Sequence, residues 1–123
     1  MHPRADNIAA RGRWGLVEWA VDARDRIIGR EFLNSQTESD QAKVYALFQQ
    51  LADIGQIRNR EKFQRVTGTE LFEFKSYQLR FFGDFRPGSR FVVASGVRKK
   101  KDKADPRDLV LALRILREHD DHE

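Results

Sequence analysis

Cysteine is absent from this 123-residue sequence, so the chain offers no disulfide, no thiolate nucleophile and no thiolate zinc site. Long apolar runs are also missing. No stretch of about 18 apolar residues is long enough to cross a membrane, and residues 1–14 lack the apolar segment of a signal peptide. Proteins without disulfides are typical of reducing compartments. We therefore predict a cytoplasmic protein with no membrane partner.

Histidine, the most frequent general base in enzymes, is scarce. The three histidines are His2, His119 and His122, each within five residues of an end of the chain, and we expect all three to be solvated. The sequence also lacks a phosphate-binding glycine loop, a paired-histidine metal motif and carboxylates at metal-ligand spacing. These absences disfavour nucleotide-dependent and metal-dependent enzymes, and we predict no metal and no cofactor.

Positive charge, by contrast, is abundant and unevenly distributed. The chain carries 23 Lys or Arg and 19 Asp or Glu, and residues 58–103 hold 13 of the basic residues against 5 acidic ones. Charge of one sign gathered in one segment raises the local potential and attracts polyanions. A solvated basic face without a partner is the alternative interpretation. We favour a surface that binds an acidic polymer, RNA above all.

The first half of the chain predicts one strand and two helical segments. Residues 13–21 are rich in aromatic and β-branched types, which is typical of a strand, and a short helical turn is expected around residues 30–34. Thr37 is a candidate N-cap and Gly55 a candidate stop for a helix whose apolar residues recur at helical spacing. Residues 56–70 lack periodicity and are predicted to form a basic loop.

The second half predicts three strands, at residues 71–76, 78–82 and 90–97, with a hairpin turn at residues 86–89. The last strand is apolar almost throughout, as expected of a central strand covered on both faces. Asp105 and Pro106 are typical of a helix start, as an N-cap followed by proline at the first helical position. Leu113 is expected in the buried apolar stripe of this last helix.

This order of elements predicts an α+β fold. We expect a small, largely antiparallel sheet of about four strands, two helices from the N-terminal half and a C-terminal helix, with the helices packed on one face of the sheet. No internal repeat or linker interrupts the sequence, so we predict a single domain over residues 1–123. Residues 1–12 and 119–123 are expected to be flexible ends.

Lysines and arginines make up the candidate site. If the three strands pair in hairpin register, Lys75, Arg80 and Arg98 converge on one side of the sheet, with Arg80 exposed and contributing little to stability. The further candidates come from the turn and the two flanking loops: Arg58, Arg60, Lys62, Tyr77, Lys99, Lys100, Lys101 and Lys103. Tyr77 or Phe82 is expected to stack on unpaired bases.

Such a cation cluster can bind RNA passively or cleave it. RNA carries its own nucleophile, the 2′-hydroxyl, so a ribonuclease needs only to remove that proton, stabilise the crowded phosphate and protonate the leaving 5′ oxygen. Arginine suits the second task because its planar fork binds phosphate through two bonds. Residue types and spacing leave binding and cleavage equally open.

Three stretches together resemble a known family. Residues 67–75 (TGTELFEFK), residues 78–82 (QLRFF) and residues 96–100 (GVRKK), followed by Lys103 and Pro106, are similar to the RelE/HigB-like toxins of type II toxin–antitoxin systems. The similarity is strongest to the phage-derived subgroup of the RelE/ParE superfamily. It extends over residues 14–118 in the order of elements.

The resemblance implies a RelE-like toxin domain that acts as a metal-independent endoribonuclease, an mRNA interferase. Such a toxin cleaves mRNA on the ribosome, inhibits translation and is held inactive by a cognate acidic or helix-turn-helix antitoxin. Catalytic roles fall on Lys75, Arg80 and Lys100. RNA-binding roles fall on Arg58, Arg60, Lys62, Tyr77, Arg98, Lys99, Lys101 and Lys103.

One departure concerns the general base. Many members carry histidine before the glycine at the end of the last strand, where this chain has Ser95, so the resemblance does not identify the base. The superfamily also includes ParE-like gyrase inhibitors that do not cleave RNA. The alternative is therefore a non-nucleolytic ParE-like gyrase inhibitor or an inactive phage-derived RNA-binding homologue.

Overall fold

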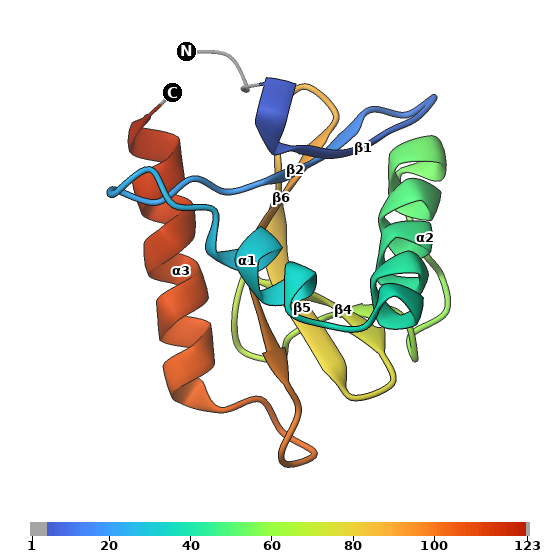
Figure 1. Ribbon diagram of the computed structural model, residues 1–123, viewed down its shortest axis with the longest axis vertical. Helices are drawn as coiled ribbons and strands as arrows, with labels where there is room; N and C mark the ends of the chain where they lie inside the picture. Colours follow the sequence, from blue (N-terminus) through green and yellow to red (C-terminus); the bar gives the residue numbers. More distant parts are fainter. Residues whose placement is uncertain (1–4, 123) are drawn as a thin grey trace.

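The computed structural model describes residues 5–122 and confirms the α+β class. A six-stranded mixed sheet is packed between helices (Figure 1). The helical segments are a 3₁₀ turn (Ala5–Asn7), α1 (Ile28–Asn34), α2 (Glu38–Ile54) and α3 (Pro106–Asp121). The strands are β1 (Ile8–Arg11), β2 (Leu16–Trp19), β3 (Phe63–Arg65), β4 (Phe72–Ser76), β5 (Leu79–Arg86) and β6 (Arg90–Arg98).

The sheet has the strand order β1-β2-β6-β5-β4-β3. Every neighbouring pair is antiparallel except β2 and β6, which run parallel. The prediction of about four strands was wrong because β1 and β3, of four and three residues, extend the two edges of the sheet. β6 occupies the central position that its apolar run predicted.

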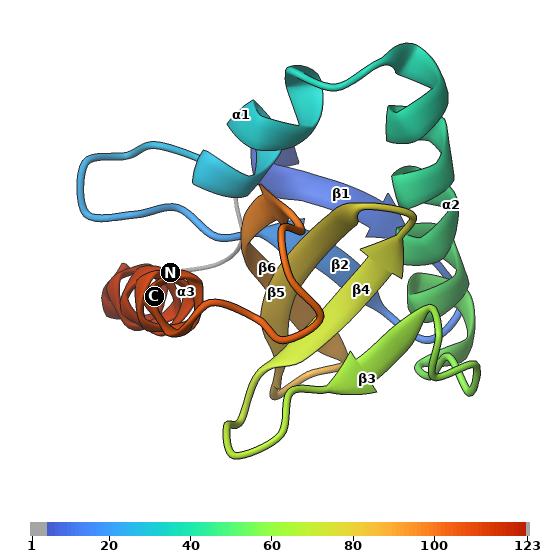
Figure 2. The ribbon, with the colours of Figure 1, turned by 90° about the horizontal axis from the view of Figure 1, so that it is seen from below.

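Helices cover both faces of the sheet, which corrects the prediction that they pack on one face. α2 lies over one face and α3 over the other (Figures 1 and 2). The α2 side buries an aromatic cluster that includes Trp19, Phe48, Phe81 and Phe91. The α3 side buries a smaller aliphatic cluster around Val92. The sheet is therefore the middle of three layers.

The predicted limits of α2 are confirmed. The side-chain oxygen of Thr37 accepts a hydrogen bond from the backbone N–H of Asp40 at 3.1 Å, which caps the first turn. Gly55 ends the helix with a φ of 82°, a left-handed conformation that glycine adopts without steric cost. The hairpin turn between β5 and β6 and the predicted start of α3 are also confirmed: the Asp105 side chain accepts from the N–H of Arg107.

The buried stripe of α3 differs from the predicted one. Ala112, Ile115 and Leu116 are buried against the sheet, whereas Leu113 is 40% exposed. Ile115 and Leu116 lie one turn beyond Ala112 on the same side of the helix, and Leu113 is turned toward solvent. The prediction that Leu113 belongs to the core was wrong.

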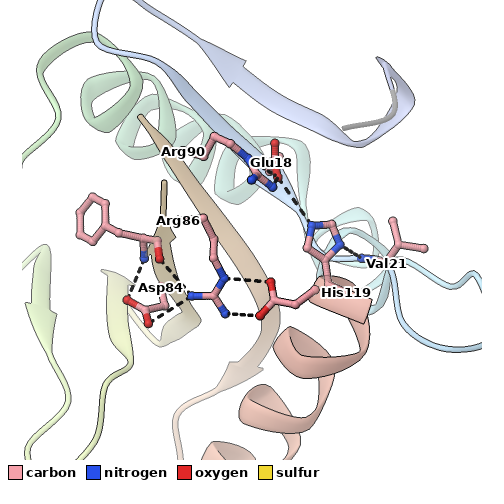
Figure 3. Close-up of polar contacts among 8 residues, drawn as sticks. Glu18, Val21, Asp84, Arg86, Arg90 and His119 are labelled. Atoms are coloured by element: carbon pink, nitrogen blue, oxygen red, sulfur yellow. Dashed lines mark hydrogen bonds and ion pairs between the residues drawn. The ribbon is translucent and has the colours of Figure 1, made fainter. Parts of the chain in front are cut away.

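The C-terminal end of α3 is tied to the sheet by polar contacts (Figure 3). His119, expected to be solvated, is 4% exposed: its Nδ1 accepts a hydrogen bond from the Val21 N–H, and its Nε2 lies 3.6 Å from Glu18 Oε1. Glu18 also accepts from the Arg90 guanidinium, with Nη2 at 2.5 Å.

Residues 1–4 and 123 of the two expected flexible ends, with His2 among them, lie outside the described residues.

Arg86 makes a second link between the sheet and α3. Its guanidinium donates two hydrogen bonds to the Asp120 carboxylate, both at 2.9 Å, and Asp84 contacts it from the same strand at 3.3 Å (Figure 3).

No helix within residues 5–122 is both long and apolar enough to span a bilayer.

Candidate nucleic-acid interface

An open concavity of about 990 Å³ lies at one end of the sheet, on the face that α3 covers further along. Its floor comes from β4, β5 and β6, and its wall from residues 99–108, which connect β6 to α3 and form the first turn of the helix. Figure 2 shows this connection passing beside the ends of β5 and β6. A hollow of this size is within the range of ligand sites.

Strand register brings the polar side chains of the floor to one face. Lys75 pairs directly with Arg80, and Glu73 pairs with Phe82 one step further along the same two strands. Because directly opposed residues in an antiparallel pair point to the same side, Glu73, Lys75 and Arg80 share the α3 face of the sheet. The sequence predicts this arrangement for Lys75 and Arg80. Arg98 pairs with Leu79, whose side chain belongs to the α2-side cluster, so Arg98 lies on the other face and the prediction that it converges with them was wrong.

Cations dominate the lining of the concavity. Four acidic residues accompany them: Glu73 from the floor, and Asp102, Asp105 and Asp108 from the wall. The basic lining residues are Arg80, Arg98, Lys99, Lys100, Lys101, Lys103 and Arg107. Among residues 5–122, no group of three or more His, Cys, Asp or Glu is arranged to hold a metal ion.

Arg80 is less exposed than predicted, since only 15% of its side chain is accessible. Its Nη1 donates hydrogen bonds to the backbone carbonyls of Tyr77 and Leu79 at 2.6 and 2.8 Å, and its Nε lies 3.6 Å from Glu73 Oε1. The guanidinium therefore braces the turn between β4 and β5 while lining the concavity. The prediction that Arg80 is an exposed residue with little structural role was wrong.

Glu73 is the residue that sequence reasoning missed. Burial raises the pKa of its carboxyl more than the neighbouring charges of Lys75, Arg80 and Lys99 lower it, so the pKa lies above its ordinary value. The signal in the sequence was its place on the polar face of a strand, two residues before Lys75.

The predicted catalytic residues are brought to one end of the sheet. Arg80 and Lys100 both line the concavity, and Lys75 lies beside Arg80 on the same face without lining it. Four of the predicted RNA-binding residues also line it: Arg98, Lys99, Lys101 and Lys103. Arg98 in addition donates to the side chain of Gln36 at 2.9 Å, which ties this end of β6 to the segment between α1 and α2.

The other predicted residues lie elsewhere. Tyr77 is 70% exposed at the turn between β4 and β5, and the ammonium groups of Lys43 and Lys62 lie 4.6 and 5.7 Å from its ring centroid. Arg58 and Arg60 are exposed on the segment between α2 and β3 and do not line the concavity. Phe82 is buried on the α3 side of the sheet, so the prediction that it stacks on bases was wrong.

Fold and site together define an α+β domain with a cationic hollow at one end of a mixed sheet. The chain belongs to the family of phage-derived Gp49-like proteins (DUF891), whose family model matches residues 31–117. The matched range runs from α1 to α3 and includes the whole floor and wall of the concavity. This membership is compatible with the role of a toxin in a toxin–antitoxin system. A search of curated proteins gave no match.

Proposed function

We propose that this protein is the toxin of a type II toxin–antitoxin system and a metal-independent endoribonuclease of the RelE/HigB kind that cleaves mRNA on the ribosome. The observation that carries the proposal is the concavity in which Arg80 and Lys100 face one hollow, with Lys75 beside Arg80 on the same sheet face. The phosphates of an RNA strand carry the negative charge that such a cationic hollow attracts.

The proposed chemistry uses the nucleophile of the substrate. The 2′-hydroxyl attacks the adjacent phosphorus, the bond from phosphorus to the 5′ oxygen breaks, and the products are a 2′,3′-cyclic phosphate and a 5′-hydroxyl. Arg80 is proposed to bind the phosphate oxygens and to stabilise the charge that develops on them. Lys75 and Lys100 are proposed to bind phosphate or to supply the proton that the 5′ oxygen takes up.

Tyr77 supports a path for single-stranded RNA that leads past the turn between β4 and β5. It has a φ of 54°, a left-handed conformation that costs a non-glycine residue energy and that recurs at functional sites. The ring is open to solvent and flanked by Lys43 and Lys62. An exposed ring beside two cations suits stacking on a base whose phosphates those cations contact.

We also propose an antitoxin partner, acidic or of the helix-turn-helix type. An acidic segment laid over the concavity would neutralise Arg98 and the lysines of the wall and would exclude mRNA. On this proposal the antitoxin and RNA compete for the same charges, so the antitoxin should protect Lys99 and Lys100 from amine-reactive labelling.

Induction of this protein alone, followed by mapping of mRNA 5′ ends, tests the proposed function. We expect growth to stop and new 5′ ends to appear within translated regions in minutes. Growth arrest with intact transcripts would contradict the proposal, and arrest with intact transcripts and broken DNA would favour a gyrase inhibitor. Harmless overexpression of folded protein would contradict both.

A further inference from the structure

Glu73 contributes the one carboxylate in the sheet floor of the concavity, among the described residues that line it. It is the second residue of β4, where its backbone pairs with Gln64 of β3 on one side and with Phe82 of β5 on the other. Its side chain is 12% exposed, so it is largely shielded from bulk water while still lining the hollow. Burying a carboxylate in such a place costs free energy of folding, so stability alone does not explain it.

The contacts of Glu73 do not account for its presence. Within residues 5–122 its carboxylate oxygens make no hydrogen bond, and its nearest charged contact is Arg80 Nε at 3.6 Å. Arg80 is already fixed by two short hydrogen bonds to backbone carbonyls, so it does not need Glu73 to hold its position. The carboxylate oxygens of Glu73 are thus available to a group that enters the concavity.

The surroundings favour a role in proton transfer. The charged residues that line the concavity around Glu73 include Arg98 from β6, Arg107 and Asp108 from α3, and Lys100, Lys101, Asp102, Lys103 and Asp105 from the connecting segment. The cations whose charges act on the Glu73 carboxyl are Lys75 from β4, Arg80 from β5 and Lys99. The pKa of Glu73 is raised by burial against the opposing effect of these cations. A raised pKa makes a carboxylate a stronger base and brings it closer to the range in which general bases work.

We propose that Glu73 is the general base of the cleavage reaction and removes the proton from the 2′-hydroxyl of RNA bound in the concavity. This inference rests on the proposed ribonuclease function. The proton passes to the Glu73 carboxylate as the 2′ oxygen forms its bond to phosphorus and the bond to the 5′ oxygen breaks. The electron pair of that bond goes to the 5′ oxygen, which takes a proton from a lysine ammonium of the site. Glu73 afterwards returns its proton to water.

Glu73→Gln is the informative variant because it keeps the shape of the side chain and removes only its charge and basicity. With mRNA on purified ribosomes under single-turnover conditions, we expect cleavage to fall about 100-fold or more, the scale of general base catalysis. Binding of the protein to a single-stranded RNA should stay the same or tighten, because a negative charge leaves a cationic hollow. The acid limb of the pH profile of cleavage should disappear with the carboxylate.

Glu70→Gln is the matched control. Glu70 is exposed just before β4 and does not line the concavity. Its removal takes away the same charge without touching the site, so cleavage should stay within about threefold of the unaltered protein with its acid limb retained. Glu73→Asp, which keeps a carboxylate on a shorter stem, should recover part of the activity and an acid limb.

A thermal measurement separates catalysis from folding. Because the pKa of Glu73 is raised in the folded protein, its contribution to stability is present at low pH and is lost as the pH rises through the folded pKa. Glu73→Gln should therefore melt at a temperature equal to or above that of the unaltered protein at neutral pH, with no gain at acid pH.

The outcomes are distinguishable. If the unaltered protein leaves ribosome-bound mRNA intact, the proposed function and this inference both fail. If the unaltered protein cleaves and Glu73→Gln cleaves equally well with the same acid limb, the base is elsewhere and only the inference fails. If Glu73→Gln loses cleavage together with RNA binding and thermal stability, Glu73 is structural and the inference again fails.

Discussion

On the proposed function, Arg80 has two tasks, and they have different chemical requirements. Bracing the turn needs only a donor that reaches the carbonyls of Tyr77 and Leu79, whereas holding a phosphate in the transition state needs a planar pair of donors. The sequence alternation correctly placed Arg80 on the polar face. It could not show that the guanidinium folds back on its own turn. That contact depends on the position of the Tyr77 carbonyl, and the positive φ of Tyr77 sets that position.

The two tasks of Arg80 can be separated by substitution. We expect Arg80→Ala to abolish cleavage and to lower the free energy of unfolding by roughly 1–3 kcal/mol, since charged hydrogen bonds to two carbonyls are lost. Arg80→Lys retains a donor for the turn and should recover most of the stability but little of the cleavage. Urea unfolding and single-turnover cleavage measure the two effects. Full cleavage by Arg80→Ala would remove Arg80 from the site.

Tyr77 makes a second prediction at this scale. Asparagine tolerates the left-handed backbone better than tyrosine does, so Tyr77→Asn should leave the free energy of unfolding within about 1 kcal/mol or raise it. Binding to single-stranded RNA should weaken by roughly 1–3 kcal/mol, the contribution of one stacked base. Fluorescence anisotropy with a labelled RNA measures the affinity, and Tyr77→Phe, which keeps the ring, serves as the control. Equal affinity of the Asn and Phe variants would exclude stacking.

Among the elements, those with their own local signals could be located from the sequence. α2 has a capping threonine and a terminal glycine, and β4 alternates between apolar and charged residues, so each could be located without knowing its neighbours. β5 was located only at its start: it continues to Arg86, four residues beyond the predicted end, because it pairs with β6 along its whole length. β1 and β3 carry no such signal: each is too short to show a period, and each becomes a strand only because an edge of the sheet is there to pair with it. The parallel pairing of β2 with β6 likewise joins segments far apart in the chain, which residue patterns do not report.

The apolar run of β6 has a consequence for the placement of the helices. A strand apolar on both faces requires cover on both faces, and that requirement contradicts a sheet with all its helices on one side. The structure resolves the conflict with α2 on one face and α3 on the other. The prediction for the buried stripe of α3 was wrong because Leu113 and Ile115 can each belong to an apolar helix face. Which of the two is buried depends on how the helix packs against the sheet.

Two aliphatic residues of α3, one buried and one exposed, test this packing. Ile115 is fully buried, and Ile115→Ala should lower the free energy of unfolding by about 2–5 kcal/mol through lost burial and a residual cavity. Leu113→Ala removes an equally large side chain from a 40% exposed position and should change it by less than about 1 kcal/mol. Urea denaturation of the two variants gives the comparison. A larger effect at Leu113 than at Ile115 would mean that α3 is rotated.

At the scale of the whole molecule, one buried carboxylate joins three elements. Glu18 of β2 contacts Arg90 of β6 and His119 of α3, and it lies at the parallel seam between β2 and β6 (Figure 3). Because the Val21 N–H donates to Nδ1 of His119, the ring proton of the neutral histidine lies on Nε2, which faces Glu18. Burial raises the pKa of Glu18, but the contacts with His119 and Arg90 outweigh it, and the pKa is lowered overall.

This network makes stability depend on pH in a defined direction. A lowered carboxyl pKa stabilises the fold above the pKa of the unfolded chain, and that contribution is lost as the pH falls through the folded pKa. Glu18→Gln should therefore lower the free energy of unfolding by roughly 3–5 kcal/mol at neutral pH, as expected when one partner of a buried pair is removed. The difference should shrink toward acid pH. Urea unfolding at several pH values between neutral and acid measures it, and a pH-independent difference would contradict the ionised pair.

The cationic concavity lies away from this network. The seam with Glu18 and His119 lies at one end of α3, whereas the cationic concavity lies at the start of the same helix. Substitutions of the exposed Lys100, Lys101 or Lys103 should therefore alter activity with small effects on stability, and substitutions at the seam should do the reverse, because distant sites contribute independently.

Cleavage of a defined mRNA by purified protein on translating ribosomes is the most direct test of the cationic concavity as a catalytic site. With a labelled transcript, we expect discrete fragments that end in a 2′,3′-cyclic phosphate, formed by the unaltered protein and lost in Arg80→Ala under conditions where that variant is folded. An intact transcript after incubation with folded, unaltered protein, or equal cleavage by both proteins, would contradict it.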